Sequence, residues 1–205
     1  PMRGGDFGIY AMRPDAGKTT FLSSESTFWL PQLDNVWPGE SRTGIWLNNE
    51  GPGKRIKQRW YQSALGATIP EMVEWAKDGS LTKRIQSALQ GMGLDRMLFY
   101  DIHDHTSGEV DAILKQTNPG FVIFDMIDNI RGFSDAPRTD LGLELMYQAA
   151  REWCVKYDMI GIATSQISNE GDNMQFPPMG ALKDSKTGKQ GACDFQLMIG
   201  HVSDP

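Results

Sequence analysis

The sequence predicts an α/β fold in which a mostly parallel, twisted sheet is flanked by helices. Its short apolar runs are continuous rather than alternating, which is typical of strands buried on both faces of a parallel sheet. Segments with helical spacing separate these runs, as in a doubly wound sheet. The length of 205 residues fits a single domain over residues 1–205, and its abrupt ends suggest a fragment of a longer protein.

Each predicted element follows from its local pattern. The strands are predicted where the apolar runs lie, at residues 7–12, 44–48, 97–102, 121–125, 159–164 and 195–199. The helices are predicted from Lys18 onward and at residues 54–66, 81–93, 107–115 and 141–157. Because ligands of such folds bind at the carboxyl ends of the strands, we expect the functional residues there.

Composition narrows the possible classes of function. Lysine and arginine total 20 and aspartate and glutamate total 26, so the net charge is −6. This balance argues against a strongly basic nucleic-acid clamp, although a few lysines in one loop could still hold DNA. The two cysteines, Cys154 and Cys193, predict no disulfide framework and fit a reducing compartment. No apolar run approaches the roughly 20 residues that span a bilayer, so we expect no membrane partner.

A phosphate-binding loop is predicted between the first strand and the first helix. The usual pattern is G-x-x-x-x-G-K-[ST]; Gly17, Lys18 and Thr19 match it, and Met12 replaces its first glycine. Backbone N–H groups can cradle phosphates, Lys18 would neutralise their oxygens, and Thr19 would ligate Mg²⁺. The alternative is a strand–turn–helix corner with a solvated lysine. The predicted nucleotide-binding residues are Arg13, Pro14, Asp15, Ala16, Gly17, Lys18, Thr19 and Thr20.

Polar residues that follow three other strands complete the predicted site. Asp125 ends an apolar run in the Walker B pattern, which would place a carboxylate beside the Mg²⁺ of Thr19. Glu50 follows the second strand and could activate the attacking water, or it is a solvated loop glutamate. Gln166 follows the fifth strand and could sense the terminal phosphate, or it is an ordinary start of a loop. Asp128 is expected to cap a turn or to face solvent.

Two weaker features favour structural interpretations. His103 and His105 lie one residue apart with no third ligand nearby, so a loop that leads to a helix cap at Thr106 is favoured over a metal site. Cys154 lies on an amphipathic helix and is expected in the core. Trp60 is expected to pack in the protein rather than to stack on bases.

The order of these motifs resembles the RecA-like ATPase domain of ring-shaped replicative DNA helicases, which include the DnaB family and the phage primase-helicase proteins. The stretch from Met12 to Thr19 is similar to the family's A-R-P-S-M-G-K-T loop. Glu50 matches the position of its catalytic glutamate, Asp125 its Walker B aspartate, and Gln166 its sensor glutamine. Residues 182–185 resemble its L-R-E-S segment, and residues 190–194 the stretch that follows.

The resemblance implies a P-loop motor that couples ATP hydrolysis to translocation on single-stranded DNA and to duplex unwinding. It implies ATP and Mg²⁺ as cofactors, with Lys18, Glu50 and Gln166 as catalytic residues. It also implies a homo-oligomer in the form of a hexameric ring, with a primase and a polymerase as candidate partners, in a bacterial or phage-infected cytoplasm. Two loops, at residues 131–140 and 168–189, would line the channel. The candidate DNA-binding residues are Arg131, Arg138, Lys183, Lys186 and Lys189.

The chain departs from the family pattern in two places. Residues 168–173 are acidic where the phage enzymes carry lysines. No arginine stands near His201, where the family has the arginine that completes a neighbour's site. Lys183, Lys186 or Lys189 could replace it. The resemblance also suggests that Arg55 and Arg59 pair across a subunit interface.

Three other functions remain open from the sequence. A recombinase-type filament ATPase would share the domain but pair strands. A small-molecule P-loop kinase would usually carry an arginine-rich lid and no glutamate after the second strand. A non-catalytic assembly module would bind the nucleotide without turnover.

Overall fold

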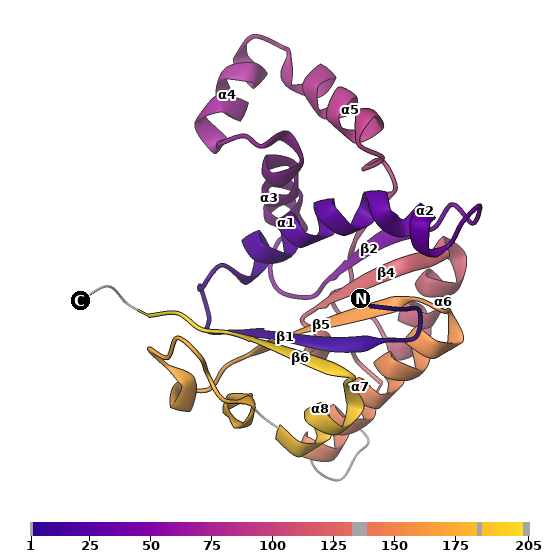
Figure 1. Ribbon diagram of the computed structural model, residues 1–205, viewed down its shortest axis with the longest axis vertical. Coiled ribbons are helices and arrows are strands. Elements are labelled where there is room, and N and C mark those ends of the chain that lie inside the picture. Colours follow the sequence, from indigo (N-terminus) through magenta and orange to yellow (C-terminus); the bar gives the residue numbers. More distant parts are fainter. Residues whose placement is uncertain (1, 133–138, 184–185, 203–205) are drawn as a thin grey trace.

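The computed structural model describes the chain except residues 1, 133–138, 184–185 and 203–205. The described residues form a six-stranded sheet in the order β3-β2-β4-β5-β1-β6, and every strand pair is parallel. The strands are β1 (Phe7–Met12), β2 (Thr43–Asn48), β3 (Met97–Asp101), β4 (Pro119–Asp125), β5 (Ile160–Gln166) and β6 (Phe195–Ile199). The predicted α/β class and all six predicted strands are confirmed (Figure 1).

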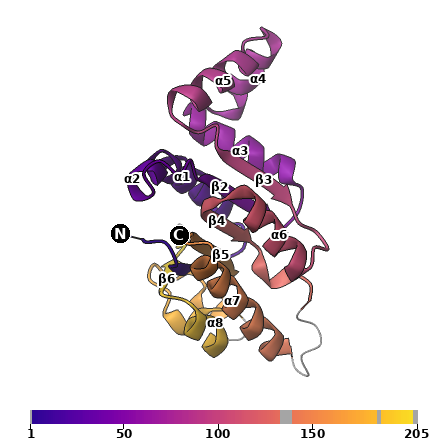
Figure 2. The same cartoon turned by 90° about the vertical axis from the view of Figure 1, so that its right-hand side faces the viewer.

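Helices connect and cover the strands. They are α1 (Lys18–Trp29), α2 (Leu33–Val36), α3 (Gly53–Leu65), α4 (Ile69–Lys77), α5 (Leu81–Gly91), α6 (Ser107–Thr117), α7 (Thr139–Lys156) and α8 (Lys186–Ala192). Short 3₁₀ turns are η1 (Leu30–Gln32), η2 (Ile127–Asn129), η3 (Asn169–Gly171) and η4 (Met179–Ala181). Viewed in Figures 1 and 2, α1 and α3 lie on one side of the sheet and α6, α7 and α8 on the other.

The helices α2, α4 and α8 were not predicted. Pro70 in α4 looks like a helix breaker, but it lies in the first turn, where proline is tolerated, behind a capping box of Thr68 and Glu71. The second channel loop was predicted at residues 168–189, and the predicted end was wrong, because α8 begins at Lys186. Apart from η3 and η4, residues 168–183 are irregular, as expected of a loop.

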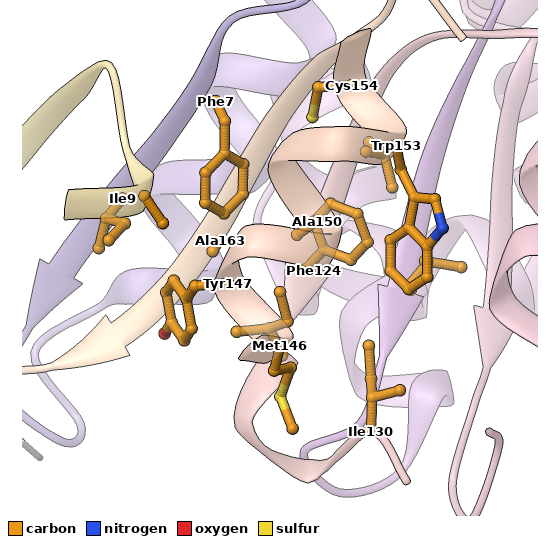
Figure 3. Close-up of a cluster of buried hydrophobic side chains, with 14 of the residues drawn as sticks. Phe7, Ile9, Phe124, Ile130, Met146, Tyr147, Ala150, Trp153, Cys154 and Ala163 are labelled. Carbon is orange, nitrogen blue, oxygen red and sulfur yellow. The ribbon is translucent and has the colours of Figure 1, made fainter. Parts of the chain in front are cut away.

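A hydrophobic core lies on each face of the sheet. The α7 side holds Phe7, Phe124, Tyr147 and Trp153, and Figure 3 shows these rings packed between the strands and α7. Phe124 stacks on Trp153 with ring centroids 6.0 Å apart. Cys154 is buried in the same cluster, as predicted. The opposite face packs α1 and α3 against the sheet, with Trp60 buried there, also as predicted.

The register brings the ends of distant strands to one edge of the sheet. Asn48 of β2 pairs in register with Asp125 of β4 and with Asp101 of β3. Met12 of β1 pairs with Gln166 of β5. All of these residues stand at the carboxyl ends of their strands, so parallel pairing alone gathers the predicted site residues at this edge.

Candidate functional site

The loop between β1 and α1 has two backbone features that suit phosphate binding. Gly17 adopts φ +92°, in the left-handed region that glycine enters without strain. A Cβ added there would meet nothing within 4 Å, so conformation rather than crowding demands glycine. No side chain caps the N-terminus of α1, so no cap pairs with the first backbone N–H groups of this helix. These amides and the helix dipole favour an anion at this point.

Lys18 is held by two carboxylates. Its Nζ lies 2.7 Å from Oε2 of Glu50 and 3.3 Å from Oδ1 of Asp125. The Lys18 side chain is only 12% exposed, whereas that of Glu50 is 46% exposed. The predicted cation, the Walker B carboxylate and the predicted catalytic glutamate therefore converge on one point.

Asp125 is fixed on both of its oxygens. Its carboxylate is buried and accepts hydrogen bonds from the Thr164 hydroxyl at 2.9 Å and from the Trp46 indole N–H at 3.2 Å. These bonds hold the carboxylate at the end of β4 in one orientation. Thr164 thus supports the site, a role that the sequence analysis did not assign to it. The sequence feature that could have indicated this role is its place on β5, two residues before Gln166.

The donor set fits Mg²⁺ bound together with phosphates. Among the described residues, no group of three or more His, Cys, Asp or Glu side chains could hold a metal by itself. Mg²⁺ is usually held by one or two protein oxygens, with water and substrate phosphates completing its shell. Thr19 and Asp125 could supply those two oxygens, and the loop amides beside Thr19 could cradle the phosphates.

A cavity of about 290 Å³ is lined by Lys18, Thr19 and Glu50. Its lining comprises Met12, Arg13, Pro14, Asp15, Gly17, Lys18, Thr19, Glu50, Gly51, Pro52, Arg55, Ile56, Arg59 and Gln166. All three predicted catalytic residues are thus brought together. Six of the eight predicted nucleotide-binding residues line the cavity, and Ala16 and Thr20 do not. Thr20 instead accepts a hydrogen bond of 3.4 Å from Arg59.

Arg55 and Arg59 face the same cavity as Lys18 within this chain. They lie on α3 one turn apart, directly after the Glu50 loop. The sequence signal was their four-residue spacing, which puts both on one face of a helix.

Arg13 links the phosphate-binding loop to the segment after Gln166. Its Nη1 donates to the Ile167 carbonyl at 3.0 Å and to Oδ1 of Asn169 at 3.1 Å. Its Nε lies 3.2 Å from the Asp172 carboxylate. The acidic stretch that departs from the family pattern therefore has a partner within the phosphate-binding loop.

The prediction that Lys189 binds DNA was wrong. Lys189 has a side chain 1% exposed, and its amine lies 2.9 Å from Oδ2 of Asp128 and 3.3 Å from the Ser165 hydroxyl. A buried, paired lysine can neither contact DNA nor complete a neighbour's site. Asp128 was expected to cap a turn or to face solvent. Its carboxylate instead lies largely inside the protein and forms an ion pair with Lys189.

The other DNA-binding candidates are only partly described. Arg131 is exposed and forms an ion pair with Asp104, and Lys183 is exposed in the segment after Gln166. Arg138 lies outside the described residues, as does the side chain of Lys186.

The two histidines lie in a loop that leads to a helix cap. Thr106 caps α6 in a capping box with Glu109, as predicted. Nε2 of His103 lies 3.1 Å from the Gly51 carbonyl, in the loop that carries Glu50.

Comparison with known proteins identifies the family. A family model described as an AAA domain, AAA_25, matches residues 2–172. The chain belongs to this AAA domain family. No curated protein matches the sequence.

Solved structures of ATPase domains share the fold. One solved ATPase domain is 17% identical with a TM-score of 0.76, covering 96% of this chain and 70% of that chain. A DnaB-like replicative helicase, solved for its interactions with primase, is 19% identical with a TM-score of 0.71, covering 96% of this chain and 47% of that one. This AAA domain therefore has the RecA-like fold, and it spans less than half of the second structure. No helix among the described residues is long and apolar enough to cross a membrane.

Proposed function

We propose that this AAA domain is the ATP-hydrolysing motor of a replicative-type DNA helicase. The convergence of Glu50 and Asp125 on Lys18, which lines one cavity together with Glu50 and the phosphate-binding loop, carries the proposal. Phosphoryl transfer needs few parts: a cradle for the phosphates, a metal to neutralise charge, and a group to orient the nucleophile. Each part has a candidate here.

The residues divide this work between them. The loop amides and Lys18 bind the phosphates of ATP, and Thr19 and Asp125 hold Mg²⁺, which neutralises charge on the phosphate oxygens. Glu50 accepts a proton from the attacking water. Gln166, on the cavity wall, contacts the terminal phosphate and passes its presence to residues 167–183.

The Lys18–Glu50 ion pair opens when ATP binds. A phosphate that takes Lys18 releases the Glu50 carboxylate, which is then free to accept the proton of the attacking water. The same contact thereby keeps the general base occupied when there is no nucleotide to hydrolyse.

The helicase part of the proposal rests on the shared fold. We infer that the motor acts on single-stranded DNA as a homo-oligomer, a hexameric ring, with Arg131, Arg138, Lys183 and Lys186 as the candidate DNA contacts. The solved structure that was studied with primase suggests a primase as partner, with a polymerase as a further candidate. We propose a cytoplasmic setting.

Steady-state ATP hydrolysis with and without single-stranded DNA tests the proposal, at low and moderate salt. Lys18→Ala serves as the inactive control. Turnover that DNA stimulates, less so as salt rises, is the expected result. Tight ATP binding without turnover would instead indicate an assembly module, and phosphate transfer to a nucleoside monophosphate would indicate a kinase. A DNA-stimulated ATPase that forms filaments rather than rings in electron micrographs would indicate a recombinase.

A further inference from the structure

The loop that carries Glu50 is fixed by a side chain from its own strand. Asn48 ends β2 and is buried. Its Oδ1 accepts a hydrogen bond of 3.2 Å from the Glu50 backbone N–H, and its Nδ2 donates at 2.8 Å to the Gly51 carbonyl. One amide therefore holds the backbone on both sides of the Glu50 side chain.

Asp101 holds this amide from the neighbouring strand. Nδ2 of Asn48 donates a second hydrogen bond, of 2.6 Å, to Oδ1 of Asp101 at the end of β3. The Asp101 carboxylate and the Gly51 carbonyl can only accept, so both must face the NH₂ group of Asn48. The amide oxygen is thereby left facing the Glu50 N–H. Without Asp101, one of the two N–H groups that set this orientation loses its partner.

The same carboxylate lies against the start of α3. A Cβ added to Gly53 would overlap Oδ1 of Asp101, so only glycine allows this approach. The first turn of α3 has no acidic residue, and no side chain caps it. Asp101 supplies the negative charge that a helix N-terminus favours, which fixes the far end of the Glu50 loop.

Glu50 depends on this support once a nucleotide binds. Its carboxylate is 46% exposed, and its ion pair is with Lys18. A bound phosphate would take that lysine away. The backbone of the loop must then aim the carboxylate, with Asn49 anchored to β4 through the Asp125 carbonyl and Asn48 anchored to β3 through Asp101.

We propose that Asp101 is a positioning residue for ATP hydrolysis, acting through Asn48 to aim Glu50. The proposal rests on the hydrolysis proposed above. Asp101 is absent from the cavity lining, so it affects the aim of Glu50 rather than the binding of ATP. Supporting residues of this kind typically change activity by roughly 10- to 100-fold.

The test compares Asp101→Ala, Asp101→Asn and Asn48→Ala in the full chain. We expect Asp101→Ala and Asn48→Ala to lower kcat by roughly 10- to 100-fold. The Kd of a fluorescent ATP analogue should stay near its wild-type value in all three variants, and the urea midpoint should stay near wild type in the two variants of the exposed Asp101. Asp101→Asn should recover most of kcat, because its side-chain oxygen still accepts from Asn48. Asp95→Ala is the matched control, since Asp95 is an exposed carboxylate just before the other end of β3.

A double variant separates positioning from general damage. In a Glu50→Gln background, Asp101→Ala should lower the residual kcat by less than about twofold, because no general base remains to be aimed. An equal loss in both backgrounds, or a loss that follows the urea midpoint, would overturn the inference. Unchanged kcat in Asp101→Ala would overturn it as well. A wild type that does not hydrolyse ATP would refute the proposed function together with this inference.

Discussion

Lys18 shows how much a single residue is shaped by its neighbours. Its amine meets two carboxylates, one buried and one half-exposed. Asp125 cannot move, because Thr164 and Trp46 hold its oxygens. Glu50 can move, because its carboxylate reaches partly into solvent. We therefore expect ATP to displace Glu50 from Lys18 and to leave Asp125 in place.

Glu50→Gln should bind ATP more tightly while losing turnover. Removing the carboxylate removes a competitor for Lys18, and a partly exposed ion pair contributes about 1 kcal/mol or less, so the gain in affinity is at most about fivefold. Hydrolysis should fall by roughly 100- to 10,000-fold with the general base gone. Titration with a fluorescent ATP analogue and phosphate release measure the two effects.

Glu74→Gln is the matched control for this change. Glu74 forms an ion pair of the same length, 2.7 Å, with Lys77 on α4, away from the cavity. It should change neither ATP affinity nor turnover. A Glu50→Gln variant that hydrolyses ATP at the normal rate would remove Glu50 from its assigned role.

Cys154 should not react with thiol reagents in the folded protein. Burial raises the pKa of its thiol to about 12, so at about pH 8 the group remains a protonated, inaccessible thiol. The half-buried Cys193 has a pKa raised by burial as well, and it should react faster of the two. Alkylation followed by mass spectrometry measures both rates. Equal labelling of the two cysteines in the folded chain would contradict the burial of Cys154.

At the scale of elements, α8 was the least predictable part of the described chain. Its sequence, K-T-G-K-Q-G-A, contains two glycines and little apolar periodicity. It becomes a helix because it packs on α7 and because Lys189 reaches into the interior to Asp128 and Ser165. Tertiary contacts overrode a weak local preference. Lys189 also donates to the Lys183 carbonyl, which closes the base of the segment after Gln166.

Lys189→Met should destabilise the fold by about 3 kcal/mol, because it leaves the largely buried Asp128 carboxylate without its cation. Asp128→Asn combined with Lys189→Met should recover part of the loss, since no unpaired charge then remains. Urea denaturation measures both changes. A Lys189→Met variant with a wild-type midpoint would show that the buried pair contributes nothing to stability.

At the scale of the whole molecule, the net negative charge would confine the proposed DNA contact to a few cations. The net charge is −6, and acidic residues 170 and 172 follow Gln166 closely. Arg13, in the phosphate-binding loop, neutralises part of that negative charge through its ion pair with Asp172. A phosphate at the loop and the Asp172 carboxylate would compete for the same guanidinium, which couples the cavity to residues 167–183.

The salt dependence of DNA binding should therefore be shallow. Each phosphate contact on a single strand contributes a slope of about −0.7 in log K against log salt, so Lys183→Ala should reduce the slope by about 0.7. Lys77→Ala, an exposed cation on α4, should leave it unchanged. Fluorescence anisotropy with a labelled oligonucleotide measures the slopes. Equal slopes for wild type and Lys183→Ala would exclude Lys183 from the DNA contact.

The sequence alone was enough to predict the sheet and those parts of the site that lie within single motifs. Continuous apolar runs predicted the strands, because burial on both faces requires them. The phosphate-binding loop, Glu50, Asp125 and Gln166 could be placed because each ends or follows a strand, and parallel strands end at one edge.

Only the tertiary structure decided which charges meet. From the sequence, Lys189 was expected to be a solvent-exposed cation. In the structure it lies in the interior, paired with Asp128, which stands 61 positions earlier. Arg13 reads as a phosphate ligand, yet it lies against Asn169 and Asp172. Asp101 lies within the predicted strand 97–102 and was given no role, yet its carboxylate holds Asn48 beside the Glu50 loop. Local sequence sets backbone preferences, whereas the fate of a polar side chain depends on partners that distant segments supply on folding.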